Sequence, residues 1–159
     1  VRLLIAPRHL ERLESIETLI AARRMTSERV SGVSRAVRDS VLLLDTIGKL
    51  RFIYSLANLV FVGGSLVPIG GHNILEPAFF AKPIIVGPYM HNFRQITQEF
   101  LLRRALLQVQ ESAQLFLCMK DLITDEGMCT DLGAAAKAVL ASNQGATFKN
   151  LTIMKERIV

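Results

Sequence analysis

The sequence predicts an α/β fold built on a doubly wound, mostly parallel sheet. Short apolar runs alternate along the chain with segments in which apolar residues recur at helical spacing. Most of the short runs end near glycine or proline, which mark the turns that close strands. Half of the 159 residues are hydrophobic and 21% are charged, which excludes a disordered chain and suffices for one domain with its own core.

The apolar runs predict buried strands. Those with clear boundaries are residues 1–6, 41–44, 59–62 and 84–86, followed by another short run at 106–109. Residues 115–119 are also apolar, but their pattern fits a strand and the start of a helix equally well.

The segments between the strands predict helices, because their apolar residues fall on one helical face. They are residues 10–20, 49–58, 74–81, 93–104, 132–142 and 148–159. Residues 31–40 are polar and are predicted to be a loop or a weak element.

This alternation predicts βαβ units with right-handed crossovers and helices on both faces of the sheet. In such sheets ligands bind at the carboxyl ends of the strands. Residues 7–9, 45–49, 63–73 and 87–92 follow strands directly. We therefore expect the functional site at the edge where these four loops meet.

Charge, cysteine and histidine content give weaker indications of function than the strand-end loops. The net charge of +5 suggests an anionic partner such as a nucleotide, nucleic acid or a lipid surface. The arginines are scattered, however, and paired arginines usually belong to solvated helix faces. The two cysteines and three histidines lack metal-ligand spacing, so we expect reduced thiols in an intracellular protein, with no metal and no cofactor.

No signal peptide is visible in the sequence, and no apolar run approaches the ~20 residues that span a bilayer. It opens inside a predicted strand rather than at Met, so we expect a fragment of a longer protein.

The loop GGSLVPIGGHNILEP, residues 63–77, holds two glycine pairs between a strand and a helix. Glycine permits positive φ and lets another group approach the backbone N–H closely. Free N–H groups ahead of a helix N-terminus bind phosphate or carboxylate. The spacing matches neither GxGxxG nor the Walker loop. A tight strand–helix connection explains the glycine pairs equally well.

Asn73 and Glu76 also have two interpretations. As a capping-box-like pair they stabilise a helix by about 1 kcal/mol and have no further role. Pro77 fits a helix only near its first turn, so Glu76 is expected at the helix start. There its carboxylate can accept hydrogen bonds from the vicinal hydroxyls of a ribose.

The other strand ends carry further candidates. Arg8 follows Pro7 and has paired donors suited to an anion, although a solvent-facing arginine is the alternative. Ile47, Gly48 and Lys49 can offer backbone N–H groups to a base or phosphate, and Lys49 can equally be a solvated residue at a helix start. His72 either donates to a phosphate or hydrogen-bonds its own loop.

Taken in order, four segments carry a family resemblance. They are APRHLER (6–12), VLLLDTIGKL (41–50), FVGGSLVPIGGHNILEPA (61–78) and IIVGPYMHNF (84–93). They resemble the C-terminal half of bacterial 3-deoxy-D-manno-octulosonic acid (Kdo) transferases, enzymes of lipopolysaccharide assembly. DLGAAAKAVLASNQGA (131–146) is similar to the final helices of that family. The GGS…GGHNxxEP segment is highly specific, and the resemblance covers nearly the whole chain.

The resemblance implies a Rossmann-like C-terminal domain of a two-domain GT-B glycosyltransferase. In that family the C-terminal domain binds CMP-Kdo, and the N-terminal domain binds the lipid A precursor and supplies a glutamate base. The implied donor-binding residues are Pro7, Arg8, Ile47, Gly48, Lys49, Gly71, His72, Asn73, Ile74, Leu75 and Glu76. The implied partners are CMP-Kdo, the acceptor through the missing domain, and the cytoplasmic face of the inner membrane, with no nucleic acid.

Two positions depart from the family: Leu10 stands where proline is usual, and Lys49 where an acidic residue is usual. We expect residues 1–159 to form one donor-binding domain of an N-terminally truncated Kdo transferase. No residue resembles the catalytic base, so the chain alone is expected to be inactive. The alternatives are a non-catalytic nucleotide-binding module and another GT-B enzyme, such as a UDP-sugar transferase or epimerase.

Overall fold

The structure is a computed structural model that describes the backbone of residues 2–32 and 40–156, with side chains up to Asn143. The chain divides into two compact units, Val1–Phe52 and Ile53–Val159. Each unit contains a three-stranded sheet, ordered β1-β3-β2 in the first and β4-β5-β6 in the second. All the strand pairs of both sheets are parallel, and helices connect most of the strands, which confirms the predicted α/β class.

In the first unit, β3 (Ser40–Leu43) lies between β1 (Leu4–Ile5) and β2 (Thr26–Arg29). The 3-10 helix η1 (Leu10–Arg12) leads into α1 (Leu13–Ala21), and η2 (Val30–Gly32) follows β2. The core is formed by apolar residues of α1 and β3. They are Leu13, Ile20, Val41 and Leu43.

The strand β2 was not predicted, because its sequence Thr-Ser-Glu-Arg has no apolar residue. The register with β3 and polar side-chain bonds hold it in the sheet instead. Arg29 donates from Nε and Nη2 to the two carboxylate oxygens of Glu17 at 2.8 and 2.9 Å, and Ser40 donates to Glu28 at 3.0 Å. Of the predicted loop at 31–40, residues 33–39 lie outside the described residues.

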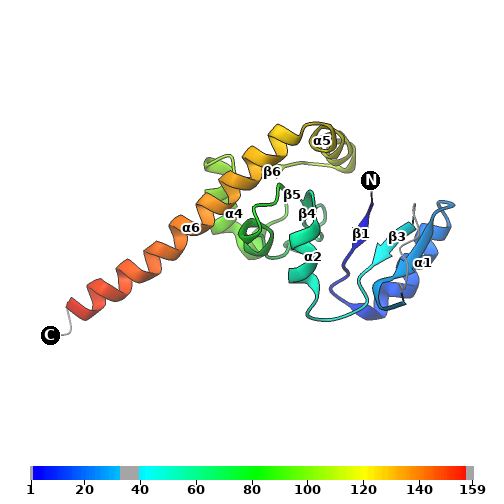
Figure 1. Ribbon diagram of the computed structural model, residues 1–159, viewed down its shortest axis with the longest axis horizontal. Coiled ribbons are helices and arrows are strands. Elements are labelled where there is room, and N and C mark those ends of the chain that lie inside the picture. Colours follow the sequence, from blue (N-terminus) through cyan, green and yellow to red (C-terminus); the bar gives the residue numbers. More distant parts are fainter. Residues whose placement is uncertain (1, 33–39, 157–159) are drawn as a thin grey trace. The chain divides into compact units, whose positions relative to one another are not determined.

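In the second unit, β5 (Ile84–Val86) lies between β4 (Val60–Phe61) and β6 (Leu107–Gln108), as Figure 1 shows. All three residues of β5 are fully buried. Ile84 and Val86 point into one apolar cluster, and Ile85 points into another on the opposite face. Since both faces of the central strand are covered, its sequence is continuously apolar rather than alternating.

The helices of this region are close to the predicted ones. They are α2 (Leu50–Leu56), α3 (Leu75–Phe79), α4 (Arg94–Leu102), preceded by the 3-10 helix η3 (His91–Phe93), α5 (Ser112–Thr124) and α6 (Glu126–Glu156). None of the helices among the described residues is both long and apolar enough to cross a membrane.

Two expectations about the C-terminal part are settled here. The ambiguous residues 115–119 belong to α5, and the two predicted helices, 132–142 and the part of 148–159 up to residue 156, lie in one continuous helix, α6. Residues 157–159 lie outside the described residues. Asp125 accepts the N–H of Met128 at 2.8 Å and so caps α6. A single glycine such as Gly145 costs a helix about 1 kcal/mol, which lowers its stability without ending it.

Three helices end in the same way without a glycine. Arg24, Ala81 and Arg104 have positive φ of 57°, 51° and 52° at the ends of α1, α3 and α4. In each case the next residue donates its N–H five residues back, as in Ala105 to Phe100 at 2.8 Å. This is the Schellman arrangement, which usually places glycine at the left-handed position.

The approach of α6 to the end of α3 depends on Gly133. A Cβ on Gly133 would lie 2.0 Å from the carbonyl oxygen of Ala81, far inside the contact distance of two non-bonded atoms. We predict that Gly133→Ala destabilises the protein, although the same change in an exposed helix interior normally stabilises it by about 1 kcal/mol. Thermal unfolding measures the effect, with Ala134→Ser, an exposed neighbour, as the control. A melting temperature that rises in Gly133→Ala would contradict this packing.

Candidate functional site

The glycine loop that follows β4 is fastened to the segment that follows β5. Ser65 is fully buried and lies between the two segments. Its hydroxyl donates to the carbonyl of Val62 at 2.5 Å and accepts the N–H of Gly87 at 2.8 Å. Its own carbonyl accepts the N–H of Tyr89 at 2.9 Å. Since a buried polar group is costly unless it is paired, this fully bonded serine makes the two loops one rigid element.

The second glycine pair extends this element. Gly71 donates to the carbonyl of Gly64 at 3.0 Å, and the Asn92 N–H donates to the carbonyl of Gly70 at 3.2 Å. The Asn92 side chain donates to the carbonyl of Ile69 at 3.2 Å. Gly64, Gly70 and Gly71 all have positive φ, the conformation for which glycine was expected here.

Asn73 and Glu76 are joined directly to each other. The amide nitrogen of Asn73 donates to Glu76 Oε1 at 3.2 Å, and Asn73 Oδ1 accepts the N–H of Leu75 at 2.9 Å. The capping box in its strict form is wrong: the N-cap of α3 is Ile74, and no side chain caps it. Asn73 instead forms a local turn that holds the Glu76 carboxylate at the start of the helix.

The helix α3 is shorter than predicted and begins one residue later. With only Leu75–Phe79 in helical conformation, its dipole is small, so an anion at the loop depends mainly on individual N–H groups and side chains. Pro77 occupies its first turn, as expected.

Tyr54, from α2, shares the surroundings of Glu76. Burial, and secondarily the Glu76 carboxylate, raise the pKa of Tyr54 to about 12 from its ordinary value near 10. The phenol therefore stays protonated over the whole physiological range and can act as a hydrogen-bond donor there. The sequence offered no signal for Tyr54 beyond its place on the apolar face of α2.

The first unit holds the remaining predicted residues. Arg8 is exposed and Pro7 half-buried, after β1, while Ile47, Gly48 and Lys49 are exposed after β3. Because β1 and β3 are adjacent and parallel, with Ile5 opposite Leu43, these two loops leave the same edge of their sheet. The structure thus brings Arg8 and the residues 47–49 to one edge, and separately groups residues 71–76 at the glycine loop of the second unit.

The loop after β3 has a defined conformation. The Asp45 carboxylate accepts the backbone N–H of Ser31 at 3.0 Å and also its hydroxyl. These hydrogen bonds hold the pKa of Asp45 below its usual range. Ile47 is 89% exposed, and Gly48 has φ of +84°. The hydroxyl oxygen of Thr46 is buried without a hydrogen-bond partner in the described part of the chain, a feature that sequence reasoning missed.

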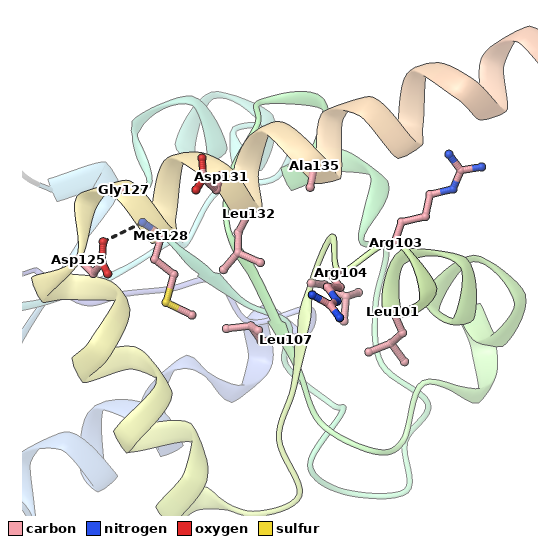
Figure 2. Close-up of a pocket in the computed structure, with 11 residues that line it drawn as sticks. Leu101, Arg103, Arg104, Leu107, Asp125, Gly127, Met128, Asp131, Leu132 and Ala135 are labelled. Atoms are coloured by element: carbon pink, nitrogen blue, oxygen red, sulfur yellow. Dashed lines mark hydrogen bonds between the residues drawn. The ribbon is translucent and has the colours of Figure 1, made fainter.

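A pocket of about 800 Å³ lies elsewhere in the second unit, between the end of α4, the start of β6 and the first turns of α6. Figure 2 shows Leu107, Met128 and Leu132 pointing into the same space, while Arg103 points away from it. Arg103 is paired with Glu99 at 3.7 Å. None of the residues that line the pocket belongs to the predicted donor set.

The described residues contain no group of three or more His, Cys, Asp or Glu side chains placed to hold a metal ion. Cys118 and Cys129 are free thiols, and burial raises the pKa of each, which lowers the thiolate fraction at neutral pH.

Comparison with known proteins identifies the family. No protein-family model matches the chain. A bifunctional glycosyltransferase/methyltransferase of Fusobacterium nucleatum is 40% identical over 127 residues, which are 78% of this chain and 20% of that protein. The 3-deoxy-D-manno-octulosonic acid transferase of Haemophilus influenzae is 34% identical over 155 residues, 96% of this chain and 36% of that protein.

A solved structure decides the assignment. The crystal structure of the C-terminal CMP-Kdo binding domain of WaaA from Acinetobacter baumannii superposes with a TM-score of 0.81 and 34% identity, covering 86% of this chain and 72% of that one. The chain belongs to the Kdo transferase family. It spans a fifth to about a third of the length of the two curated relatives. The resemblance predicted from the sequence is confirmed, while the roles of the individual residues stay predictions.

The contact between the two loops yields a test with a built-in control. A Cβ on Gly87 would lie 2.2 Å from the Ser65 carbonyl oxygen, whereas nothing lies within 4 Å of a Cβ on Gly63. We predict that Gly87→Ala lowers the melting temperature markedly, since neither backbone can move without breaking the bonds of Ser65. Gly63→Ala, in the loop after the neighbouring strand, is expected to be tolerated. Equal effects of the two substitutions would show that the loops are not fastened as described.

The environment of Tyr54 predicts how stability depends on pH. A raised pKa in the folded protein favours the neutral phenol, so this stabilisation is complete below pH 10 and is lost as the pH rises to about 12. In Tyr54→Phe this loss of stability above pH 10 should disappear. The rise in tyrosinate absorbance near pH 12, which Tyr54 gives in the wild type, should also be absent. Glu76→Gln should lower the pKa of Tyr54 only in part, because burial is the larger cause. A rise near pH 12 that persists in Tyr54→Phe would refute the assignment.

Proposed function

We propose that this chain is the donor-binding part of a Kdo transferase and that it binds CMP-Kdo. The whole enzyme would transfer Kdo from CMP-Kdo to a hydroxyl of the lipid A precursor in lipopolysaccharide synthesis. Family membership supports the reaction class, and the WaaA domain with which the chain superposes is named for CMP-Kdo binding. The remaining support comes from the chemistry of the strand-end loops.

The placement of Glu76 carries this proposal. Oε1 of Glu76 accepts from Asn73, and Oε2 accepts no hydrogen bond from any described residue. Asn73 thereby fixes the carboxylate through one oxygen and leaves the other available. A carboxylate oxygen held in this way suits the vicinal hydroxyls of a ribose, since hydrogen bonds to charged acceptors are the stronger ones.

Each unit also carries donors that, taken by itself, suit an anion such as the phosphate of CMP. Arg8 offers the paired donors that recognise phosphate or carboxylate, and the loop at Ile47, Gly48 and Lys49 offers exposed backbone and a cation. His72, beside the glycine loop, adds an imidazole.

In the transfer, a base removes the proton of the acceptor hydroxyl, and the hydroxyl oxygen bonds to the anomeric carbon of Kdo. The bond from that carbon to the phosphate oxygen breaks, and CMP leaves with the electron pair. The donor residues of this chain would stabilise the charge that develops on CMP. We assign the base and the acceptor site to a further domain of the enzyme, and the reaction to the cytoplasmic face of the inner membrane.

Calorimetric titration of CMP into the chain, compared with a separate titration of UMP, tests the proposal. We expect CMP to bind more tightly than UMP. Glu76→Gln should weaken CMP binding by roughly 10- to 100-fold, since it loses a charged hydrogen-bond acceptor. Glu111→Gln is the matched control and should bind normally, because Glu111 is exposed and its side chain makes no capping hydrogen bond to α5. Failure of the folded chain to bind CMP, or equal binding of UMP, would overturn the proposal.

A further inference from the structure

We propose that His91 is a further binding residue of the donor site and that its imidazole binds an oxyanion of the donor beside the glycine loop. This inference rests on the proposed function and deepens it. His91 was not among the residues predicted from the sequence, although the segment that contains it follows the central strand β5.

The side chain of His91 lies against Gly70. A Cβ on Gly70 would lie 2.7 Å from His91 Nε2 and 2.3 Å from Asn92 Nδ2, so both side chains lie directly against the bare Cα of the glycine. Glycine leaves room for both side chains, and its φ of +106° is strained for other residues. The imidazole nitrogen therefore lies next to the loop that the proposed function assigns to the donor.

The two neighbouring side chains have different tasks. Asn92 is engaged in the fold, because its backbone N–H donates to Gly70 and its side chain donates to Ile69. The side chain of His91 is exposed and makes no hydrogen bond or ion pair with any residue that the structure describes. Asn92 therefore anchors the segment, while the His91 imidazole lies beside Gly70 with its hydrogen-bonding capacity unspent.

A second imidazole lies on the same loop. His72 Nε2 is 3.6 Å from the position of a Cβ on Gly64, whose carbonyl accepts the N–H of Gly71. Gly64, Gly70 and Gly71 have positive φ, and the exposed imidazole of His91 beside Gly70 can donate to an oxyanion. The donor carries two such groups, the phosphate of CMP and the carboxylate of Kdo, and the Glu76 carboxylate suits neither because it repels anions.

The test separates the two oxyanions by using their parts as probes. CMP, cytidine and free Kdo are titrated into the wild-type chain, His91→Ala and His91→Gln. If His91 binds the phosphate, His91→Ala should weaken CMP binding by roughly 10-fold and leave cytidine unchanged. If it binds the carboxylate, only Kdo binding should weaken. Gln95→Ala, an exposed residue of α4 four positions away, is the control and should change neither.

A direct readout accompanies the titrations. The ring resonances of His91 should shift on addition of CMP or of Kdo, but not of cytidine. Normal CMP and Kdo binding by His91→Ala would overturn the role of His91 and leave the proposed function standing. A folded wild-type chain that binds neither CMP nor Kdo would overturn both.

Discussion

The contact between Gly87 and Ser65 is the constraint on which the second unit depends. With 2.2 Å between a would-be Cβ and the Ser65 carbonyl oxygen, the two backbones touch without an intervening side chain. The contact lies directly after the central strand β5 and joins the loop that follows β5 to the loop that follows β4. The hydroxyl of Ser65 adds two hydrogen bonds inside the core, where each is strong because the surroundings are apolar. The loop that carries His72, Asn73 and Glu76 is thereby set on the most buried strand of the sheet.

Rigidity of this kind would favour the ligand binding that we propose for the glycine-rich loop. Glycine is the residue that loses most conformational entropy on folding, so four glycines in a free loop would oppose an ordered site. Here the positive φ values and the bonds to Ser65 and Asn92 remove that freedom in the folded protein before any ligand arrives. A pre-ordered loop leaves more of the interaction energy for binding.

The sequence predicted the strands and the glycine loop well because their causes are local. Residues 84–86 form a strand because three consecutive branched apolar residues bounded by proline and glycine have few other options. Thr26–Arg29 escaped prediction because its stability comes from pairing with Ser40–Leu43 and from the Arg29–Glu17 bonds, which no local pattern reports. The sequence prediction divided α6 into two helices because it gave a local signal, Gly145, too much weight. A single glycine only weakens a helix, and α6 continues through it.

The residues of the candidate site also differ in whether a local sequence pattern or a contact in the folded chain reveals them. Glu76 was identifiable because proline after it restricts where the helix can begin, which is a covalent constraint within the sequence. Only the structure shows how its carboxylate is used within the fold: Asn73 engages one oxygen, no side chain caps α3, and the second oxygen has no partner among the described residues. Its role as a ligand stays a prediction. His91 could not be found from its sequence neighbours, since its side chain lies against Gly70, twenty-one residues earlier, in a contact that exists only in the folded chain. A side chain such as His91, unpaired among the described residues and next to a glycine of another loop, can be recognised only when the positions of both loops are known. Such contacts between loops are the places to look for binding residues outside the sequence motif.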